Sequence, residues 1–155
     1  MAYKTTSGPR DFFADLVRCE TRLYNALNDR LRERHGIVTS QYEFLHYLRA
    51  HPGSRVADLA TEFAVGIGAT SKGIDRLERQ GWVARRPNPA DRRSSLLALT
   101  EEGTRLTDAA EHTFTERVTE LVEGALDPSE VSAAVQALAL LRAALERDGV
   151  GMPTG

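Results

Sequence analysis

Hydrophobic residues recur three and four positions apart along most of this chain, which places them on one face of a helix. The first such stripe runs from Phe13 to Leu31 and ends near Gly36, and the last runs from Val131 to Leu145. The pattern predicts six helices. The first is long and ends near Gly36, the second starts at residues 40–43 and stops at Pro52-Gly53, and the short third contains Val56 to Phe63. The fourth runs from about Ile67 to Gln80, and two long helices start at residues 100–103 and at 127–130.

Polar residues at the ends of these segments support the boundaries. Residues 40–43 (Ser-Gln-Tyr-Glu) have the form of a capping box, in which the serine and glutamate side chains satisfy free backbone N–H groups. Ser54 can cap the third helix, and Thr100 can cap the fifth. Pro128 fits the first position of the sixth helix, and Gly81 is suited to close the fourth.

The period changes between residues 82 and 99. Residues 82–86 and 94–99 are short β-compatible runs, and the segment between them contains two prolines and an asparagine, which favour a turn. Two helices separated by a short glycine turn and followed by a hairpin are typical of a helix-turn-helix with a wing. The expected fold class is therefore mainly α with a small β-hairpin wing.

The first and last helices carry apolar stripes that are too long for such a small module to cover. A second copy of the chain is the simplest partner that could bury them. We therefore expect residues 37–100 to form a winged helix-turn-helix DNA-binding domain, and residues 10–36 and 101–147 to form the dimerisation region of a homodimer. Residues 1–9 and 148–155 are expected to be flexible tails.

The charge of the chain is unevenly distributed. The net charge is −2, yet residues 72–93 carry seven Lys or Arg against three acids, a net of +4, and residues 101–155 carry four against eleven, a net of −7. A basic segment beside an acidic one marks a face for an anionic partner such as double-stranded DNA. A solvated arginine-rich surface is the alternative.

Several classes of protein are excluded. No stretch approaches the ~20 apolar residues that span a membrane, and the first ten residues lack the apolar core of a signal peptide, so we expect a cytoplasmic protein. Cys19 is the single cysteine, which excludes an internal disulfide. No nucleophile elbow or complete metal motif is present, and the glycines at 66 and 68 follow a helix instead of a strand, so we expect no enzyme and no cofactor.

The fourth helix has an apolar side and a polar side. Ile67, Thr70, Ile74 and Leu77 can anchor it, which leaves Ser71, Lys72, Asp75, Arg76 and Arg79 to enter a groove of DNA. Glycines at 68 and 73 let the backbone come close either to DNA or to a neighbouring helix, and both explanations stay open. The two arginines can alternatively pair with nearby acids.

The predicted hairpin tip carries Arg92 and Arg93 next to Asp91. Arginine is attracted to a narrow minor groove, and the acid can hold a guanidinium in place through a charge-assisted hydrogen bond. A solvated turn with a surface ion pair is the alternative. The full set of candidate DNA-binding residues is Ser54, Gly68, Thr70, Ser71, Lys72, Asp75, Arg76, Arg86, Asn88, Asp91, Arg92 and Arg93.

These elements together resemble the MarR (multiple antibiotic resistance regulator) family over about residues 10–147. The matching parts are Gln41, residues 58–60, residues 74–83, Asp-Arg-Arg at 91–93 and Leu-Thr-Glu-Glu-Gly at 99–103. The resemblance implies a dimer built from the first, fifth and sixth helices and two recognition helices in successive major grooves of a pseudo-palindrome. It also implies that Arg93 enters the minor groove, that Asp91 positions it, and that the protein is a repressor released by a small ligand or an oxidant.

Small anionic aromatic molecules are the commoner effectors in that family. By location alone, the effector candidates are Arg18, Arg22, Tyr42, His46 and Arg49. Zinc sensing is an alternative, for which Glu43, His46, His112 and Glu116 are candidate ligands, but the histidine-rich run of that branch is missing. Surface side chains without a metal remain the simpler explanation.

Two further alternatives are a redox sensor based on Cys19 and a winged-helix protein that does not bind DNA. The reactive cysteine of the peroxide-sensing branch aligns with Ala14, so we do not expect Cys19 to be a redox sensor. A winged-helix adaptor that binds proteins instead of DNA would have no need for the basic tip.

Overall fold

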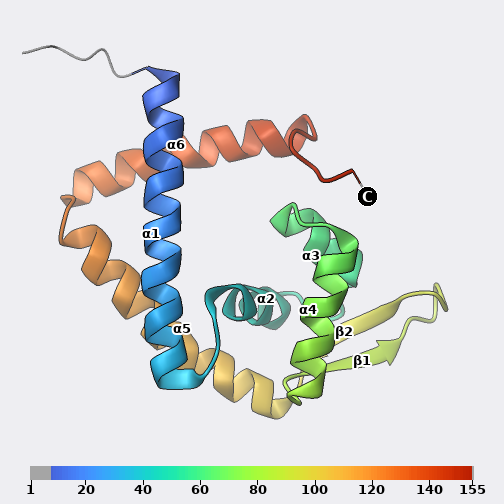
Figure 1. Cartoon of the computed structure of the whole chain (residues 1–155). Coiled ribbons are helices and arrows are strands. Elements are labelled where there is room, and N and C mark those ends of the chain that lie inside the picture. The colour runs from blue at the N-terminus through green and yellow to red at the C-terminus, as the bar shows by residue number, and fades with distance from the viewer. Residues whose placement is uncertain (1–7, 155) are drawn as a thin grey trace, which may run out of the picture.

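The computed structural model describes residues 8–154, and its elements follow the order that the sequence predicts (Figure 1). The mainly helical fold class with one small hairpin is confirmed. The bounds are α1 Pro9–His35, α2 Thr39–Ala50, α3 Val56–Phe63, α4 Ile67–Arg79, β1 Val83–Pro87, β2 Ser95–Leu99, α5 Glu101–Glu123 and α6 Pro128–Arg147.

The helix α1 ends where the sequence predicts. Gly36 adopts a left-handed conformation (φ +67°), and its N–H donates to the Arg32 carbonyl oxygen, which is a glycine C-cap. The second half of α1 packs along α5, and the two helices are further joined by an ion pair between Arg34 and Glu116 (3.0 Å). A small core of buried residues lies between these helices and α2, formed by Leu31, Ile37, Tyr42 and Ala110.

A second and larger core holds the lobe, which we define as residues 37–100. Helices α2, α3 and α4 and both strands contribute to it, so the helix-turn-helix and the hairpin fold as one unit. Its buried members are Leu45, Leu48, Leu59, Ile74, Leu77, Val83 and Leu97.

The hairpin is an antiparallel pair in which Val83 lies opposite Leu99 and Pro87 lies opposite Ser95. The segment before α3 adds an isolated β-bridge to β2, because the Leu97 N–H donates to the Ser54 carbonyl oxygen (2.8 Å). The base of the wing is thereby held on both sides, and only its tip projects away from the lobe, at the right of Figure 1.

The wing joins α5 through a tight junction. Thr100 caps α5 as predicted, because its Oγ1 accepts from the Gly103 N–H (3.0 Å) and donates to the Gly81 carbonyl oxygen (2.6 Å). Gly103 must be glycine, since a Cβ there would collide with the Trp82 carbonyl oxygen. The Leu-Thr-x-x-Gly pattern at 99–103 therefore has a structural cause.

Two predicted caps are wrong. Helix α2 begins at Thr39 instead of Ser40, and Gln41 Oε1 accepts from the backbone N–H of Val38 (3.0 Å). Helix α3 is not capped by Ser54. The N-cap position is Arg55, whose N–H donates to Asp58 Oδ2 (2.8 Å).

The start of α6 is as predicted. Pro128 occupies its first turn, and Asp127 and Glu130 cap each other's backbone N–H groups, each at 2.9 Å.

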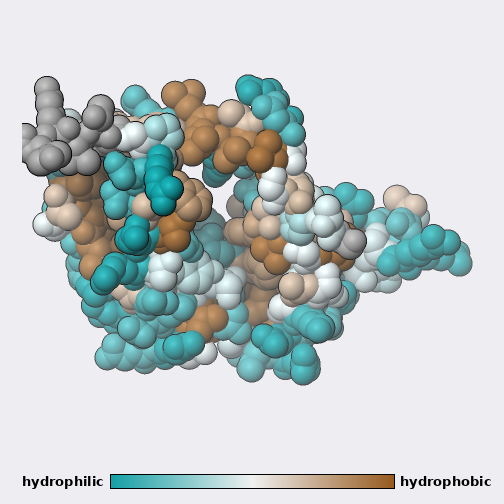
Figure 2. Space-filling view, turned by 45° about the horizontal axis from the view of Figure 1, so that its top comes forward, coloured by the Kyte–Doolittle hydropathy of each residue, from teal (hydrophilic) through white to brown (hydrophobic). Residues whose placement is uncertain are grey.

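Large apolar side chains remain exposed on α6 and on the first half of α1. Helix α6 has no buried residue, and hydrophobic residues gather over it at the top of the view in Figure 2. The exposed side chains on these helices are Phe12, Phe13, Val17, Val135, Leu138, Leu140, Leu141 and Leu145.

The ends of the chain are described only in part. Of the predicted tail 1–9, residues 1–7 lie outside the described part, and Pro9 already belongs to α1. After α6 the chain makes turns through Gly149 and Gly151, both with positive φ. No helix in residues 8–154 has the length and hydropathy that crossing a bilayer requires.

Candidate nucleic-acid interface

Helix α4 divides into a buried and an exposed side, as the sequence predicts, with one exception. Thr70, Ile74 and Leu77 are completely buried. Ile67, which the pattern assigns to the same buried side, is 62% exposed, because it is the first residue of the helix and extends past the edge of the core.

Two candidate residues are not available to DNA in this structure. The side chain of Thr70 is completely buried, and its hydroxyl donates to the Gly66 carbonyl oxygen (2.9 Å). Ser54 is buried as well, and its hydroxyl donates to the His51 carbonyl oxygen (2.7 Å). Both hydroxyls therefore stabilise local backbone, and we remove the two residues from the candidate set.

The two glycines of α4 have different surroundings. A Cβ added at Gly73 would lie 3.1 Å from a ring carbon of Phe44, so close packing of α2 on α4 favours glycine there. A Cβ added at Gly68 would meet nothing within 4 Å. Packing therefore accounts for Gly73 and not for Gly68, which is exposed in the first turn of the helix.

Asp75, a predicted DNA-contacting residue, instead pairs with Arg85 of β1. The same guanidinium lies 3.7 Å from Glu78. Arg85 is thus held by two acids of α4, and the ion pairs tie the wing to the recognition helix. The sequence assigned no role to Arg85, and its pairing is visible only once α4 and β1 are packed together.

The turn at the wing tip is shaped by polar side chains. Asn88 Oδ1 accepts from the Ala90 N–H (3.0 Å), and its amide donates to Ser94 Oγ (2.9 Å). Asp91 Oδ1 accepts from the backbone N–H of Arg93 (2.9 Å). Asp91 therefore orders the turn itself, whereas the predicted bond to a guanidinium is not formed.

Several cations on this side of the molecule are exposed. Within residues 8–154 they make no ion pair, so their charges are available to an anionic partner. Helix α4 and the hairpin that carry them lie next to each other, and the protruding wing ends in hydrophilic residues at the right of Figure 2. These cations are Lys72, Arg76, Arg79, Arg86, Arg92 and Arg93, of which Arg79 also donates to the Asp75 carbonyl oxygen (3.3 Å). The half-buried Ser71 lies on the same helix.

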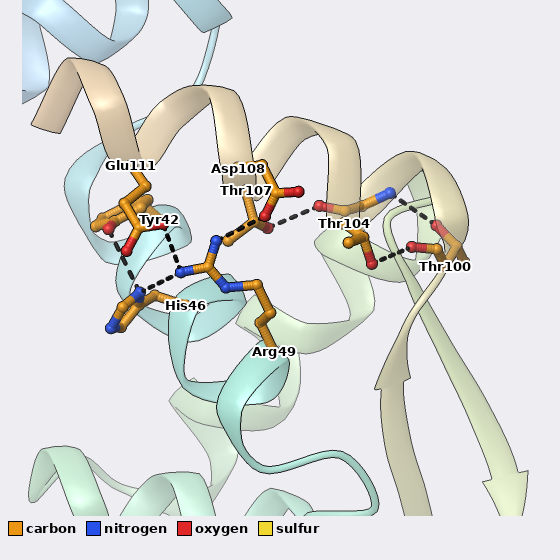
Figure 3. A network of polar contacts seen from close by, with 9 residues as sticks. Tyr42, His46, Arg49, Thr100, Thr104, Thr107, Asp108 and Glu111 are labelled. Atoms are coloured by element: carbon orange, nitrogen blue, oxygen red, sulfur yellow. Dashed lines mark hydrogen bonds and ion pairs between the residues drawn. The ribbon is translucent and has the colours of Figure 1, made fainter.

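The candidate effector residues of α2 belong to a polar network with α5 (Figure 3). Arg49 donates to Asp108 (2.7 Å) and pairs with Glu111 (2.8 Å). His46 Nδ1 lies 3.3 Å from Arg49 Nη2 and 3.4 Å from the Tyr42 hydroxyl. The His46 ring therefore lies between the Tyr42 hydroxyl and the Arg49 guanidinium.

This network leaves little capacity for a ligand. Burial raises the pKa of Tyr42 to about 12, so its hydroxyl stays protonated, and its ring stacks on Phe114 at 4.6 Å. Arg49 is already neutralised by two carboxylates, while Arg18 and Arg22 are exposed on α1 and do not bond to the network among the described residues. We therefore correct the predicted effector set: the structure does not bring it together as one site.

A different cavity of about 600 Å³ lies against the recognition helix. Aromatic rings of Tyr24, Phe44 and Phe63 line it, and Lys72 and Arg76 of α4 lie at its border. Glu43 also faces it, and burial raises the pKa of this carboxyl group above its ordinary value.

The candidate metal ligands do not form a site. Glu116 pairs with Arg34, and His112 is exposed. In the described part of the chain, no three His, Cys, Asp or Glu side chains are placed to hold an ion. Cys19 is exposed on α1, where it lines an apolar groove between α1 and α6.

Two helices joined by a short turn and followed by a basic hairpin define a winged helix-turn-helix protein. The model of the MarR family matches residues 37–95. The chain is also 31% identical to the multiple antibiotic resistance protein MarR of Salmonella typhimurium over 106 residues, which are 64% of this chain and 72% of that protein. The chain therefore belongs to the MarR family, whose members are DNA-binding transcription regulators and not enzymes.

Solved structures agree with this assignment. A mutant MarR from E. coli complexed with operator DNA is 26% identical, with a TM-score of 0.74 over 87% of this chain and 99% of that one. A MarR family regulator from Streptomyces coelicolor, in complex with DNA, gives a TM-score of 0.82 over 92% of this chain and 90% of that one. At 23% identity, the second likeness concerns the fold alone.

Proposed function

We propose that this regulator is a homodimer that represses transcription from a pseudo-palindromic operator and is released by a small anionic effector. The observation that carries the proposal is the group of cations without ion pairs on α4 and the wing. The lobe that bears them is attached to a helical body that is acidic. Such a surface attracts the phosphate backbone, and the counterions it displaces make the affinity dependent on salt.

Dimerisation is supported by the exposed apolar side chains of α6 and of the first half of α1. A 20-residue helix with no buried residue lacks the tertiary packing that normally stabilises helices of this length. A second copy would cover both surfaces and set two lobes a fixed distance apart. In successive major grooves, two recognition helices lie about 34–36 Å apart.

In this arrangement, α4 enters the major groove and the wing, residues 82–99, reaches the adjacent minor groove. Lys72 in the middle of α4 and Arg76 in its last turn contact phosphates or base edges, and Arg93 enters the minor groove. Asp91 contributes indirectly, because it orders the turn that presents Arg93.

The effector proposal rests on the cavity beside α4. Its volume lies in the range of small-molecule sites, about 300–1,000 Å³, and its rings and cations suit an aromatic carboxylate or phenolate. Such an anion would pair with Lys72 and Arg76, which DNA also needs. Competition for these two side chains gives a direct physical reason for release.

The test uses the purified chain and a duplex selected from a random-sequence library by the wild-type protein. Fluorescence anisotropy measures binding, and analytical ultracentrifugation measures the oligomeric state. We expect a dimer whose affinity falls steeply between about 50 and 200 mM salt. Arg93→Ala should lose about 1–3 kcal/mol of binding free energy and remain dimeric.

The matched control is Arg105→Ala, which removes another exposed arginine, located on α5 and paired with Glu101. We expect its affinity to equal that of the wild type. A monomer, or a failure to bind any duplex at low salt, would refute the proposal and favour a winged-helix adaptor. Undiminished binding by Arg93→Ala would remove the wing from the mechanism.

A further inference from the structure

Ile67 is an isolated exposed hydrophobic residue. It is 62% exposed, and within the described residues it is the only large apolar side chain of the lobe 37–100 with such exposure. The other exposed ones lie on the first half of α1, on α6 and beside the ends of α6, which are the surfaces assigned to a second copy. Dimerisation therefore does not explain why the Ile67 side chain is exposed.

The backbone around Ile67 is bare. Gly66 precedes it and Gly68 follows it, and a Cβ at either glycine would meet nothing within 4 Å. The glycines are therefore not required by packing inside the protein, and φ is negative at Gly66 and not in the left-handed range at Gly68. Their effect is to leave open space on both sides of the isoleucine.

The first turn of α4 offers no polar side chain that could form hydrogen bonds to a base. Ala69 is exposed and small, and the hydroxyl of Thr70 is buried and already donates to Gly66. The nearest exposed polar side chain is Lys72, more than one turn further along the helix. Ile67 is thus the largest group that the start of the recognition helix presents to a partner.

The major groove contains one apolar group, the C5 methyl of thymine, and recognition helices approach base edges with their N-terminal residues. We propose that Ile67 packs against the C5 methyl of a thymine in each half-site and thereby selects thymine at that position. This inference rests on the proposed DNA binding, and it assigns the first turn of α4 to apolar readout instead of hydrogen-bond readout.

The test removes single methyl groups from the DNA. In the duplex selected by the wild-type protein, each thymine of one half-site is replaced in turn by deoxyuridine, which lacks only the methyl. We expect one replacement to weaken wild-type binding by about fourfold, the factor for one buried methyl-sized group. Ile67→Ala should bind the unmodified duplex more weakly and lose nothing further on that replacement.

The matched control is Lys72→Ala on the same helix. It should also weaken binding, but it should keep the wild-type penalty for the missing methyl. If no replacement weakens the wild type, or if Ile67→Ala remains equally sensitive, the inference is refuted while DNA binding stands. If the wild type selects no duplex at all, it is the proposed function that fails.

Discussion

At the scale of single residues, Gly68 and Gly73 lie in one helix and are glycine for different reasons. Glycine in a helix interior costs about 1 kcal/mol relative to alanine. At Gly73 the neighbouring Phe44 ring explains why glycine is present despite that cost, since a Cβ there would lie 3.1 Å from a ring carbon. At Gly68 no atom of the described residues does. Under the proposed function, the approach of DNA would account for the glycine there.

We therefore predict different consequences for two identical substitutions. Gly68→Ala should raise the free energy of unfolding by about 0.5–1 kcal/mol through helix propensity, and it should weaken DNA binding because the methyl occupies the space left for the duplex. Gly73→Ala should gain less stability, because the Phe44 ring must shift. Thermal unfolding and anisotropy measure both effects. Equal stabilisation by both variants would contradict the packing argument.

Glu43 provides a prediction about pH. Burial raises the pKa of its carboxyl group above the ordinary 4.5, so the folded chain holds this proton more tightly than the unfolded chain. The folded state therefore loses stability as the pH rises from 4.5 through the raised pKa. Glu43→Gln lacks this loss, so we expect it to have a higher Tm than the wild type at neutral pH.

This Tm difference should shrink as the pH falls below 4.5, where the wild-type carboxyl group is protonated in both states. The control is Glu33→Gln, at an exposed glutamate of α1. Its Tm should follow that of the wild type at every pH. A Glu43→Gln difference that does not depend on pH would mean that burial of the charge is not its cause.

At the scale of elements, the sequence predicts the order and type of the helices and strands in the described residues, but it misplaces two N-caps. Thr100 and Asp127 cap helices through residues three positions away, which a sequence pattern can contain. The two misplaced caps are as local as these, since Gln41 and Asp58 each accept from a backbone N–H three positions earlier.

Tertiary bonds decide which residues are left to serve as caps. At the start of α2, the Thr39 N–H donates to Asn28, a residue of another helix. The Ser54 backbone pairs with Leu97 of the hairpin. Such tertiary partners are invisible to local pattern.

The same limit applies to the candidate interface. Counting charges from residues 72 to 93 identifies a basic segment correctly, but it treats all arginines alike. Because β1 packs against α4, Arg85 forms ion pairs with Asp75 and Glu78. Arg92 and Arg93 stay exposed at the tip. The division between structural and available cations depends on which elements become neighbours.

The pairing of Asp75 with Arg85 leads to a prediction that separates positioning from charge. If charge alone mattered, Asp75→Asn would strengthen DNA binding, because it removes an anion from the interface. We predict the opposite, a loss of about 0.5–2 kcal/mol, the range for residues that act without touching the ligand. The wing, no longer fixed to α4, would then have to be ordered by the DNA itself.

The control is Glu78→Gln, which removes the more distant acid at 3.7 Å and leaves the main pair intact. It should bind at least as tightly as the wild type. Anisotropy at a single fixed salt concentration compares the variants. Tighter binding by Asp75→Asn would show that Arg85 serves DNA better when released.

At the scale of the whole molecule, the small core formed by Leu31, Ile37, Tyr42 and Ala110 joins the lobe to the helical body, and further contacts add to it. The backbone junction of Trp82 with Gly103 fixes the base of the wing to α5, and Arg49 fixes α2 to Asp108 and Glu111 (Figure 3). Polar contacts between the lobe and α5 keep their relative orientation. A dimer built on the body would therefore hold both lobes at a defined separation.

The exposed face of α6 allows this to be tested. Leu138→Glu combined with Leu141→Glu places two charges among the exposed apolar side chains of α6. We predict a monomer whose lobe stays folded, because no residue of α6 belongs to a buried core of the single chain. Its helical content should fall by no more than the share of α6, which loses the packing that the partner supplies. Its affinity for the palindromic duplex should fall by about a hundredfold or more, since the second half-site no longer binds as part of the same molecule.

The control must carry the same two charges on the polar side of α6. Gln136→Glu combined with Ala143→Glu does so at exposed positions, and we expect it to remain dimeric with wild-type affinity. Net charge near DNA is then equal in both variants, so any difference between them reflects the loss of the partner. If the leucine variant stayed dimeric, the apolar face of α6 would need another occupant. If it became monomeric and still bound the palindrome at full strength, the two lobes would not be acting as a pair.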